Sequence, residues 1–350
     1  MIPDLGDVLS ADEVQATAAS IARLQLPNGM IQWYPGGHAD PWNHVETAMA
    51  LTIAGRWHEA ELAYQWLIDT QLPDGSWHNY YRPDGTVEDP KLDTNVIAYI
   101  ATGAWHHWQT TTDRGFAEHV WPTVQRAIDF VLELQTPRGE IIWARHTGGR
   151  PWTYALLTGS SSICHALRCA VALAQVVDSE RPDWELSAVT LAEVIRTQPG
   201  AFEPKTRWAM DWYYPVLANV VTGADAQNRL AAKWDEFVLP GRGVRCVNNE
   251  PWVTASETAE CAIAYAAVGL TETATDLLTW TRAHRQADGS YLTGLVYPDV
   301  ISFPDGECSA YTAAAVLLAA DLISRSTPAS GLFIGDDLPP VESSGTTIPH

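Results

Sequence analysis

Two carboxylates one helical turn apart, Glu257 and Glu260, are the clearest chemical feature of the chain. At this spacing both side chains lie on the same face of a helix, where like charges repel. Stability alone would not favour such a pair. Paired carboxylates are typical of acid–base catalysis, because burial beside a second acid keeps one carboxyl group protonated near neutral pH.

Further acids stand at the starts of other predicted helices, among them Glu46, Asp93 and Asp211. Two carboxylates about 6.5–9.5 Å apart suit hydrolysis of a glycosidic bond by one acid, one base and one water. We therefore predict catalytic roles for Glu257, Asp93, Asp211 and Glu46, with Glu257 as proton donor and Asp93 or Asp211 as base. Helix capping is the alternative for each acid taken alone. Each start carries more polar and aromatic groups than one cap requires.

Sixteen tryptophans among 350 residues point to a ligand that stacks on aromatic faces. Many lie in connections between predicted helices, where indoles suit sugar rings or a prenyl chain. Packing of these loops on the protein is the alternative. Aromatic and polar groups near the helix starts form the predicted substrate-binding set: Trp42, His44, Trp77, Asn95, His165, Trp212, Tyr213, Tyr214, Trp252, Glu260, Glu307 and Tyr311.

A repeated turn marks the elements that must position these residues. The segment from Gln25 to Gly29 recurs from Gln71 to Gly75, from 135 to 139, and in degenerate form from 285 to 289. Its proline and glycine end a helix. Amphipathic helices are expected over 11–26, 56–72, 116–135, 183–197, 226–237 and 271–285. Apolar, alanine-rich helices are expected over 43–54, 94–108, 161–177, 212–222, 254–268 and 308–323.

The alternation of these two helix types predicts the fold. Helices that are apolar all round are buried, whereas those with one apolar stripe lie outside. We therefore predict an all-α fold, an (α/α)6 barrel of six inner and six outer helices, forming a single domain over residues 1–325. A flexible tail is expected over 326–350, which is rich in Pro, Ser and Gly. The inner helices would begin at one rim, where the acids and aromatic residues gather.

Charge and cysteine content exclude several classes of partner. The formal net charge is −21, which is unsuited to nucleic acid or an anionic membrane. Without a signal peptide or an apolar run long enough to span a membrane, we expect a cytoplasmic protein. Its five cysteines are expected to be buried thiols. A zinc site of Cys164, His165, Cys261 and Cys308 is the alternative, but no paired-ligand motif supports it, and neither metal nor cofactor is predicted.

The Gln-x3-Gly turns resemble the QW-type repeats of the terpenoid cyclase and protein prenyltransferase β-subunit superfamily, over residues 11–325. This resemblance implies a helical toroid, with either an Asp-rich acid motif or a zinc site. The segment Lys91-Leu-Asp93-Thr-Asn95 is the nearest to that acid motif and lacks its acid cluster. The helix starts at 41–46 and 211–215 are more similar to those of the six-hairpin glycosidases, which share the barrel.

Three functions follow from this pattern. The favoured one is a carbohydrate-active enzyme, resembling a glycoside hydrolase, that acts on a small-molecule or oligosaccharide ligand without a cofactor. The second is an isoprenoid enzyme, a prenyltransferase or terpene cyclase without the usual motifs, because aromatic walls also stabilise carbocations. The third is a non-catalytic toroid that binds a glycan or peptide. The pattern leaves the oligomeric state open.

Overall fold

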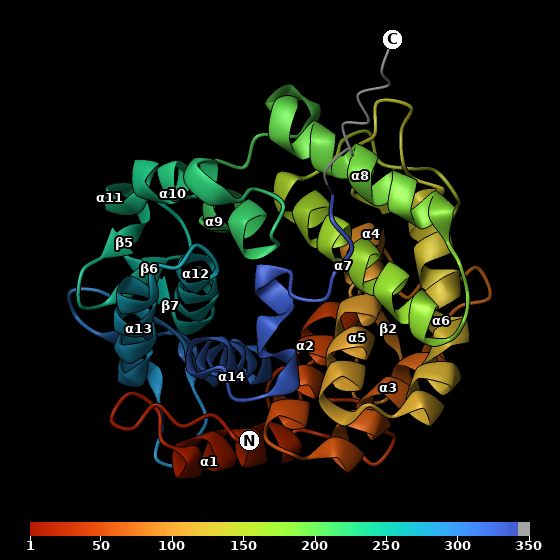
Figure 1. Cartoon of the computed structure of the whole chain (residues 1–350). Coiled ribbons are helices and arrows are strands. Elements are labelled where there is room, and N and C mark those ends of the chain that lie inside the picture. Colours follow the sequence, from red (N-terminus) through yellow and green to blue (C-terminus); the bar gives the residue numbers. More distant parts are fainter. Residues whose placement is uncertain (342–350) are drawn as a thin grey trace.

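A computed structural model describes residues 1–341 of the chain. This part of the chain is mainly helical, with 14 α-helices and three small sheets (Figure 1). None of the helices described here is long and apolar enough to cross a membrane.

Six helical units form a closed ring around the centre of the molecule (Figure 1). They are α2 (Pro41–Ile53), α4 (Thr94–Ala98) continued by α5 (Ile100–Thr111), α7 (Leu157–Val176), α9 (Met210–Leu217), α12 (Ala255–Ala267) and α14 (Ala310–Ser324). Each unit contacts the next, and α14 returns to α2. Their residues are buried almost all round, as expected for alanine-rich apolar helices.

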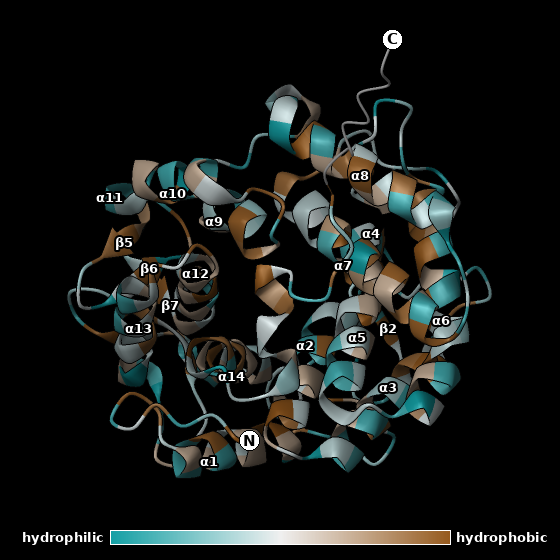
Figure 2. Cartoon of the chain, viewed as in Figure 1, coloured by the Kyte–Doolittle hydropathy of each residue, from teal (hydrophilic) through white to brown (hydrophobic). Residues whose placement is uncertain are grey.

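The amphipathic helices pack outside this ring, each against the inner helix that precedes or follows it. They are α1 (Ala11–Ala22), α3 (Trp57–Thr70), α6 (Arg114–Leu132), α8 (Pro182–Thr197), α10 (Gly223–Ala232) with α11 (Trp234–Phe237), and α13 (Thr271–Trp280) followed by the 3-10 helix η2 (Thr281–His284). Figure 2 shows hydrophilic and hydrophobic residues mixed along α3, α6 and α8. All twelve expected helices are present, with boundaries that differ by a few residues.

Three of the repeated turns fasten outer helices to one another: α1 to α3, α3 to α6, and α6 to α8. Gln71 Nε2 donates to the Gly75 carbonyl and to the Thr123 carbonyl of α6, both at 2.9 Å. Gln25 and Gln135 make the equivalent pairs of bonds, with α3 and α8. Gly75 has a φ of +91°, and a Cβ there would lie 2.2 Å from a backbone oxygen of α6. Glycine is therefore required where the turn touches the next helix.

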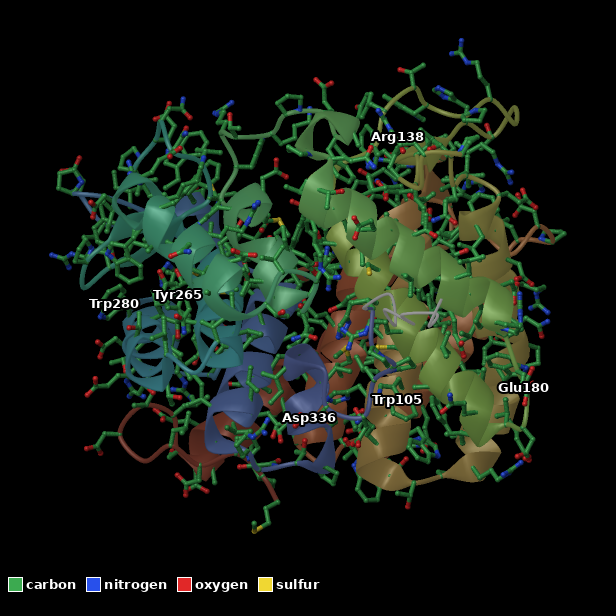
Figure 3. The ribbon with its side chains drawn as sticks, turned by 45° about the horizontal axis from the view of Figure 1, so that its top comes forward. Trp105, Arg138, Glu180, Tyr265, Trp280 and Asp336 are labelled. Atoms are coloured by element: carbon green, nitrogen blue, oxygen red, sulfur yellow. The ribbon has the colours of Figure 1, made fainter. Side chains whose placement is uncertain are left out.

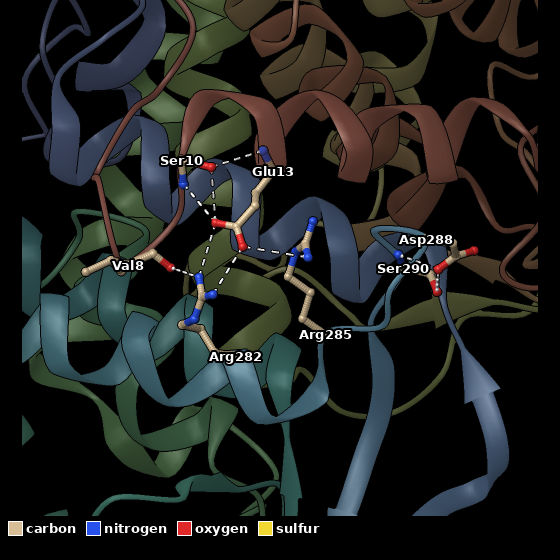
Figure 4. Close-up of polar contacts among 7 residues, drawn as sticks. All are labelled: Val8, Ser10, Glu13, Arg282, Arg285, Asp288 and Ser290. Carbon is tan, nitrogen blue, oxygen red and sulfur yellow. Dashed lines mark hydrogen bonds and ion pairs between the residues drawn. The ribbon is translucent and has the colours of Figure 1, made fainter.

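Ion pairs close the ring between the first and last outer helices. Glu13 of α1 accepts hydrogen bonds from Arg282 of η2, and its carboxylate lies 3.7 Å from the Arg285 guanidinium (Figure 4). The hydrogen bond with Arg282 lowers the pKa of Glu13 to about 2. Ser10 caps α1 in a reciprocal capping box with the same carboxylate.

The all-α prediction is confirmed in part: the described residues are mainly helical, but short strands occupy several connections. The largest sheet has five antiparallel strands: β5 (Val238–Leu239), β6 (Gly243–Arg245), β7 (Trp252–Thr254), β8 (Leu292–Val296) and β9 (Ile301–Cys308). In the chain, β7 leads directly into α12, and β9 is followed by α14. Two further pairs join β1 (Tyr80–Tyr81) to β2 (Val87–Asp89), and β3 (Leu92–Asp93) to β4 (Ala144–Arg145).

Residues 326–341 differ from the expected flexible tail. The 3-10 helix η3 (Pro328–Ile334) packs against α5, α12 and α14, and its Leu332 carbonyl lies 3.1 Å from His165 Nε2. Arg168 and Arg196 then bind the carbonyls of Pro339 and Val341. Figure 3 labels Asp336 of this segment and Trp105 of α5, one of the helices that η3 contacts. Buried Leu and Phe side chains hold a segment whose composition suggested a loose one. The rest of the expected tail, 342–350, lies outside the described residues.

Candidate functional site

A cavity of about 300 Å³ lies at the end of the ring where the inner helices begin. It is lined mainly by residues from the caps and first turns of α2, α4, α12 and α14. The lining residues are Trp33, Asp40, Trp42, Asn43, Asn79, Tyr80, Lys91, Asp93, Asn95, Val96, Met210, Ser256, Glu257, Glu260 and Tyr311. The structure thus brings together six of the predicted site residues: Trp42, Asp93, Asn95, Glu257, Glu260 and Tyr311.

Asp93 is held rigidly at the junction of β3 and α4. Its Oδ1 accepts the amide hydrogens of Asn95 and Val96, at 3.1 and 3.4 Å, as the N-cap of α4. Its Oδ2 lies 3.5 Å from Lys91 Nζ. Burial raises the pKa of Asp93, although the Lys91 charge opposes that rise. One oxygen is therefore anchored to the helix, while the other bears no backbone hydrogen bond.

Glu257 enters the cavity from the first turn of α12. The hydroxyl groups of Thr254 and Ser256 both donate to its Oε2, the latter at 2.8 Å. In the ring order, α12 is three units away from α4, so Glu257 and Asp93 reach the cavity from opposite sides.

Two buried acids lie beneath Glu257. Tyr213 of α9 donates a hydrogen bond to Glu260, and burial together with the Glu257 charge raises the pKa of Glu260 to about 8. Burial and the nearby Glu260 charge raise the pKa of Glu46 well above its ordinary value. Tyr214 lies near both acids, because each of them raises its pKa. Burial therefore favours the protonated form of both Glu260 and Glu46.

The buried pair predicts a pH dependence of stability. Between pH 4.5 and about 8 the folded protein keeps a Glu260 proton that the unfolded chain loses, so this residue destabilises the fold as pH rises. We expect Glu260→Gln to raise Tm relative to the parent chain progressively over that interval. Thermal melts at pH 5 and pH 8 measure the difference. The control is Glu185→Gln on the exposed face of α8, and an equal Tm shift at both pH values would contradict the assignment.

Asp40, which the predicted set did not include, is the fourth carboxylate that lines the cavity, with Asp93, Glu257 and Glu260. It is the N-cap of α2, directly before Pro41, and its Oδ1 accepts the Asn43 amide at 3.0 Å. Its Oδ2 accepts from Trp33 Nε1 and Asn43 Nδ2, both at 2.7 Å. An acid before a helix-starting proline was the signal that could have identified it. All of these partners donate hydrogen bonds to Asp40, and the bonds fix the orientation of its carboxylate.

Asp211 lies away from the cavity. Its oxygens accept the Thr158 hydroxyl at 2.8 Å and the Lys205 amide at 3.2 Å. It lines a separate pocket on the outside of the ring with Trp208 and Arg229. The side chain of Asp211 therefore fixes the loop before α9, whereas the preceding residue, Met210, lines the cavity.

Two histidines of the predicted substrate-binding set are packed in the core. His44 receives a hydrogen bond from the Ile31 amide and contacts the Ala63 carbonyl at 2.9 Å. His165 faces η3, with its Nε2 3.1 Å from the Leu332 carbonyl. Burial lowers the pKa of each to about 4. Both are neutral structural groups outside the cavity.

Tryptophans from the predicted set are likewise used for packing. Trp77 is fully buried, and its indole donates to the Leu67 carbonyl at 2.9 Å. Trp212 donates to the Arg229 carbonyl and stacks on Phe237.

The two predicted residues on the five-stranded sheet also lie outside the cavity lining. Trp252 stacks on Phe303 across strands, with ring centroids 4.7 Å apart. Glu307 accepts a hydrogen bond from the Thr293 hydroxyl at 2.9 Å. Strand pairing, which the helical pattern did not predict, turns both residues toward sheet neighbours.

The described residues offer no assembled metal site. Within residues 1–341, no three His, Cys, Asp or Glu side chains are grouped as ligands. The five cysteines are free thiols. Cys164 instead donates to the Ala188 carbonyl, at 3.6 Å.

Comparison with known proteins shows the class of protein to which the chain belongs. No family model matches the chain. The chain is 47% identical over 338 residues to the MMP endo-(1,4)-3-O-methyl-α-D-mannosidase of Mycolicibacterium hassiacum, covering 97% of this chain and 93% of the relative. The chain belongs to the family of that enzyme, and it is a carbohydrate-active hydrolase.

Solved structures share the fold at low sequence identity. A wild-type glycosidase has a TM-score of 0.71 at 15% identity, covering 89% of this chain and 96% of its own. A D-mannose isomerase has a TM-score of 0.67 at 13% identity, with coverage of 90% and 97%. A GH63 mannosylglycerate hydrolase from Thermus thermophilus, in complex with glucose, has a TM-score of 0.65 at 13% identity, with coverage of 88% and 99%.

These relatives support the resemblance to six-hairpin glycosidases and give no support to terpenoid cyclases or prenyltransferases. The physical reason lies in the repeated turns. Their Gln and Gly residues join one outer helix to the next. Any toroid built from two helical layers needs such a connection, so the turns report architecture and not chemistry.

Proposed function

We propose that the chain is an endo-acting α-mannosidase of (α/α)6-barrel architecture that hydrolyses (1→4)-linked chains containing 3-O-methylmannose. The substrate class rests on the 47% identity to the relative of that name. The observation that carries the mechanism is the pair Glu257 and Asp93, which line one cavity from opposite sides of the ring. Five free thiols support a reducing, cytoplasmic setting.

Glu257 is the general base in this mechanism. Its carboxylate, hydrogen-bonded by the hydroxyls of Thr254 and Ser256, accepts a proton from the attacking water. This role differs from the expected one of proton donor. The expectation relied on Glu260 being beside Glu257, but it is the pKa of the buried Glu260 itself that is raised.

Asp93 is the general acid. Burial raises its pKa, and its Oδ2, which bears no backbone hydrogen bond, is the oxygen suited to carry a proton to the leaving sugar. After transfer, the Lys91 ammonium at 3.5 Å stabilises the resulting carboxylate. An acid and a base on opposite helices leave room for a sugar and one water, which is the arrangement for inversion at the anomeric carbon.

The remaining lining groups are suited to hold the sugar. Asp40 accepts three hydrogen bonds, and the lone pair that remains on its carboxylate can accept one from a sugar hydroxyl. Trp42 stacks on Tyr99 with ring centroids 4.7 Å apart, and Trp33 meets Tyr311 edge-on at 4.8 Å. These aromatic walls suit the apolar faces of sugar rings and, in particular, methyl ethers.

Incubation of the purified chain with a (1→4)-linked oligosaccharide of 3-O-methyl-α-mannose tests the proposal. We expect internal cleavage to shorter oligosaccharides. Mass spectrometry of the products monitors this cleavage. The unmethylated α-(1→4)-mannose oligosaccharide is the control for the methyl group. Absence of cleavage of both oligosaccharides would overturn the proposed function.

A further inference from the structure

An aromatic cluster that no assigned role accounts for lies beside the cavity, next to Asp93. Trp143 packs edge-on against Trp152 with centroids 4.8 Å apart and stacks on Tyr154 at 5.5 Å. His146 stacks on the other side of Trp152 at 5.1 Å. Trp143, Trp152 and Tyr154 are each partly exposed, and His146 is exposed. We call Trp143, Trp152 and Tyr154 the aromatic cluster.

The aromatic cluster is carried by a hairpin that is fixed to Asp93. The hairpin closes through the Trp143 amide, which donates to the Tyr154 carbonyl at 2.9 Å. Its first strand, β4, pairs with β3, with Asp93 opposite Ala144. The Thr94 amide also donates to the Trp143 carbonyl, at 3.0 Å. A ligand on these rings would therefore be held in a defined position relative to Asp93.

Cationic groups connect the aromatic cluster to the cavity and extend it outward. Lys91, which lines the cavity, lies 4.3 Å from the centre of the Trp143 ring. Lys205 lies 5.8 Å from the Tyr154 ring on the far side. The chain has only three lysines, so two of them flank this cluster in a protein of net charge −21. Ammonium groups beside aromatic faces offer donors to hydroxyls around a stacked ring.

We propose that the aromatic cluster is a distal sugar-binding subsite, which holds residues of the oligosaccharide remote from the bond that is cleaved. This inference rests on the proposed function. A cavity of about 300 Å³ is at the small end of ligand sites and takes a short stretch of a glycan. An enzyme that cuts within a chain must bind the chain beyond that stretch. The aromatic cluster provides partly exposed rings in continuity with the cavity through Lys91.

Trp152→Ala tests the subsite, because the Trp143 side chain hydrogen-bonds to Asp93, whereas Trp152 belongs to the aromatic cluster and does not line the cavity. On long oligosaccharides we expect KM to rise roughly 3- to 10-fold with kcat little changed, which is the effect of one lost stacking contact. On the shortest oligosaccharide that is cleaved, both constants are expected to stay unchanged. Trp152→Phe, which keeps a ring, should restore most of the long-chain KM. The matched control is Trp57→Ala, an exposed tryptophan, 47% accessible, at the start of outer helix α3.

Equal losses on long and short oligosaccharides, or no change on either, would overturn the subsite. Calorimetric titration of a long oligosaccharide into Glu257→Gln enzyme, with and without Trp152→Ala, separates this inference from the proposed function. Weaker binding in the Trp152→Ala background supports the subsite even if the parent chain cleaves nothing, a result that would overturn the hydrolase proposal alone. Absence of binding overturns both.

Discussion

Glu257→Gln is expected to lower kcat on the oligosaccharide by about 1,000-fold, within the range of roughly 100- to 10,000-fold that a general base contributes. The amide keeps the size of the side chain and can still accept from Thr254 and Ser256. It cannot take a proton from water. Because the sugar-binding walls are untouched, KM should change little. Initial rates across substrate concentrations measure both constants.

The control for this variant is Asp211→Asn. Asp211 shares the predicted catalytic set with Glu257, but it lies in a pocket outside the ring and binds Thr158. Its amide variant should retain kcat within a few-fold. A Glu257→Gln enzyme that turns over as fast as the parent chain would remove Glu257 from the mechanism.

Asp93→Asn is expected to produce a loss of about 100- to 10,000-fold in kcat that depends on the leaving group. A general acid matters most when the departing sugar is a poor leaving group. An activated aryl glycoside of the same oligosaccharide needs little protonation, so the Asp93→Asn enzyme should recover most of its rate on that substrate. Glu257→Gln should remain slow on it, because the base is still required. Parallel assays on the two substrates separate the roles.

Asp40→Asn tests whether Asp40, and not Asp93, is the proton donor. Asp40 also lines the cavity and is also buried, but its oxygens are occupied by three donors. We expect its amide variant to raise KM, with no recovery on the activated substrate. If recovery on the aryl glycoside appeared in Asp40→Asn and not in Asp93→Asn, the proton donor would be Asp40.

The helical layers could be predicted from the sequence because burial acts on whole elements. In α14, twelve of fifteen residues are buried, and its alanine-rich composition predicts that environment directly. The five-stranded sheet could not be predicted in the same way. Its strands, such as β7 and β8, are short, and their pairing joins residues near 253 to residues near 295, far apart in the sequence. The packing of η3 likewise depends on partners in α7.

A cavity at the start of the inner helices was predictable, but the choice of side chain that lines it from each start was not. Successive residues of a helix point about 100° apart, since one turn takes about 3.6 residues. Met210 therefore faces the cavity while Asp211 faces the outside of the ring. On α2, Trp42 and Asn43 line the cavity, whereas His44 is buried against α3. Only the packed structure fixes the rotation of each helix.

The anomeric configuration of the first product tests the opposed-carboxylate mechanism most directly. Proton NMR spectra recorded during cleavage of the α-linked oligosaccharide distinguish the new reducing end before it mutarotates. A base and an acid on opposite sides of the cavity, with water between the base and the sugar, predict that the β anomer appears first. Initial appearance of the α anomer would contradict this account.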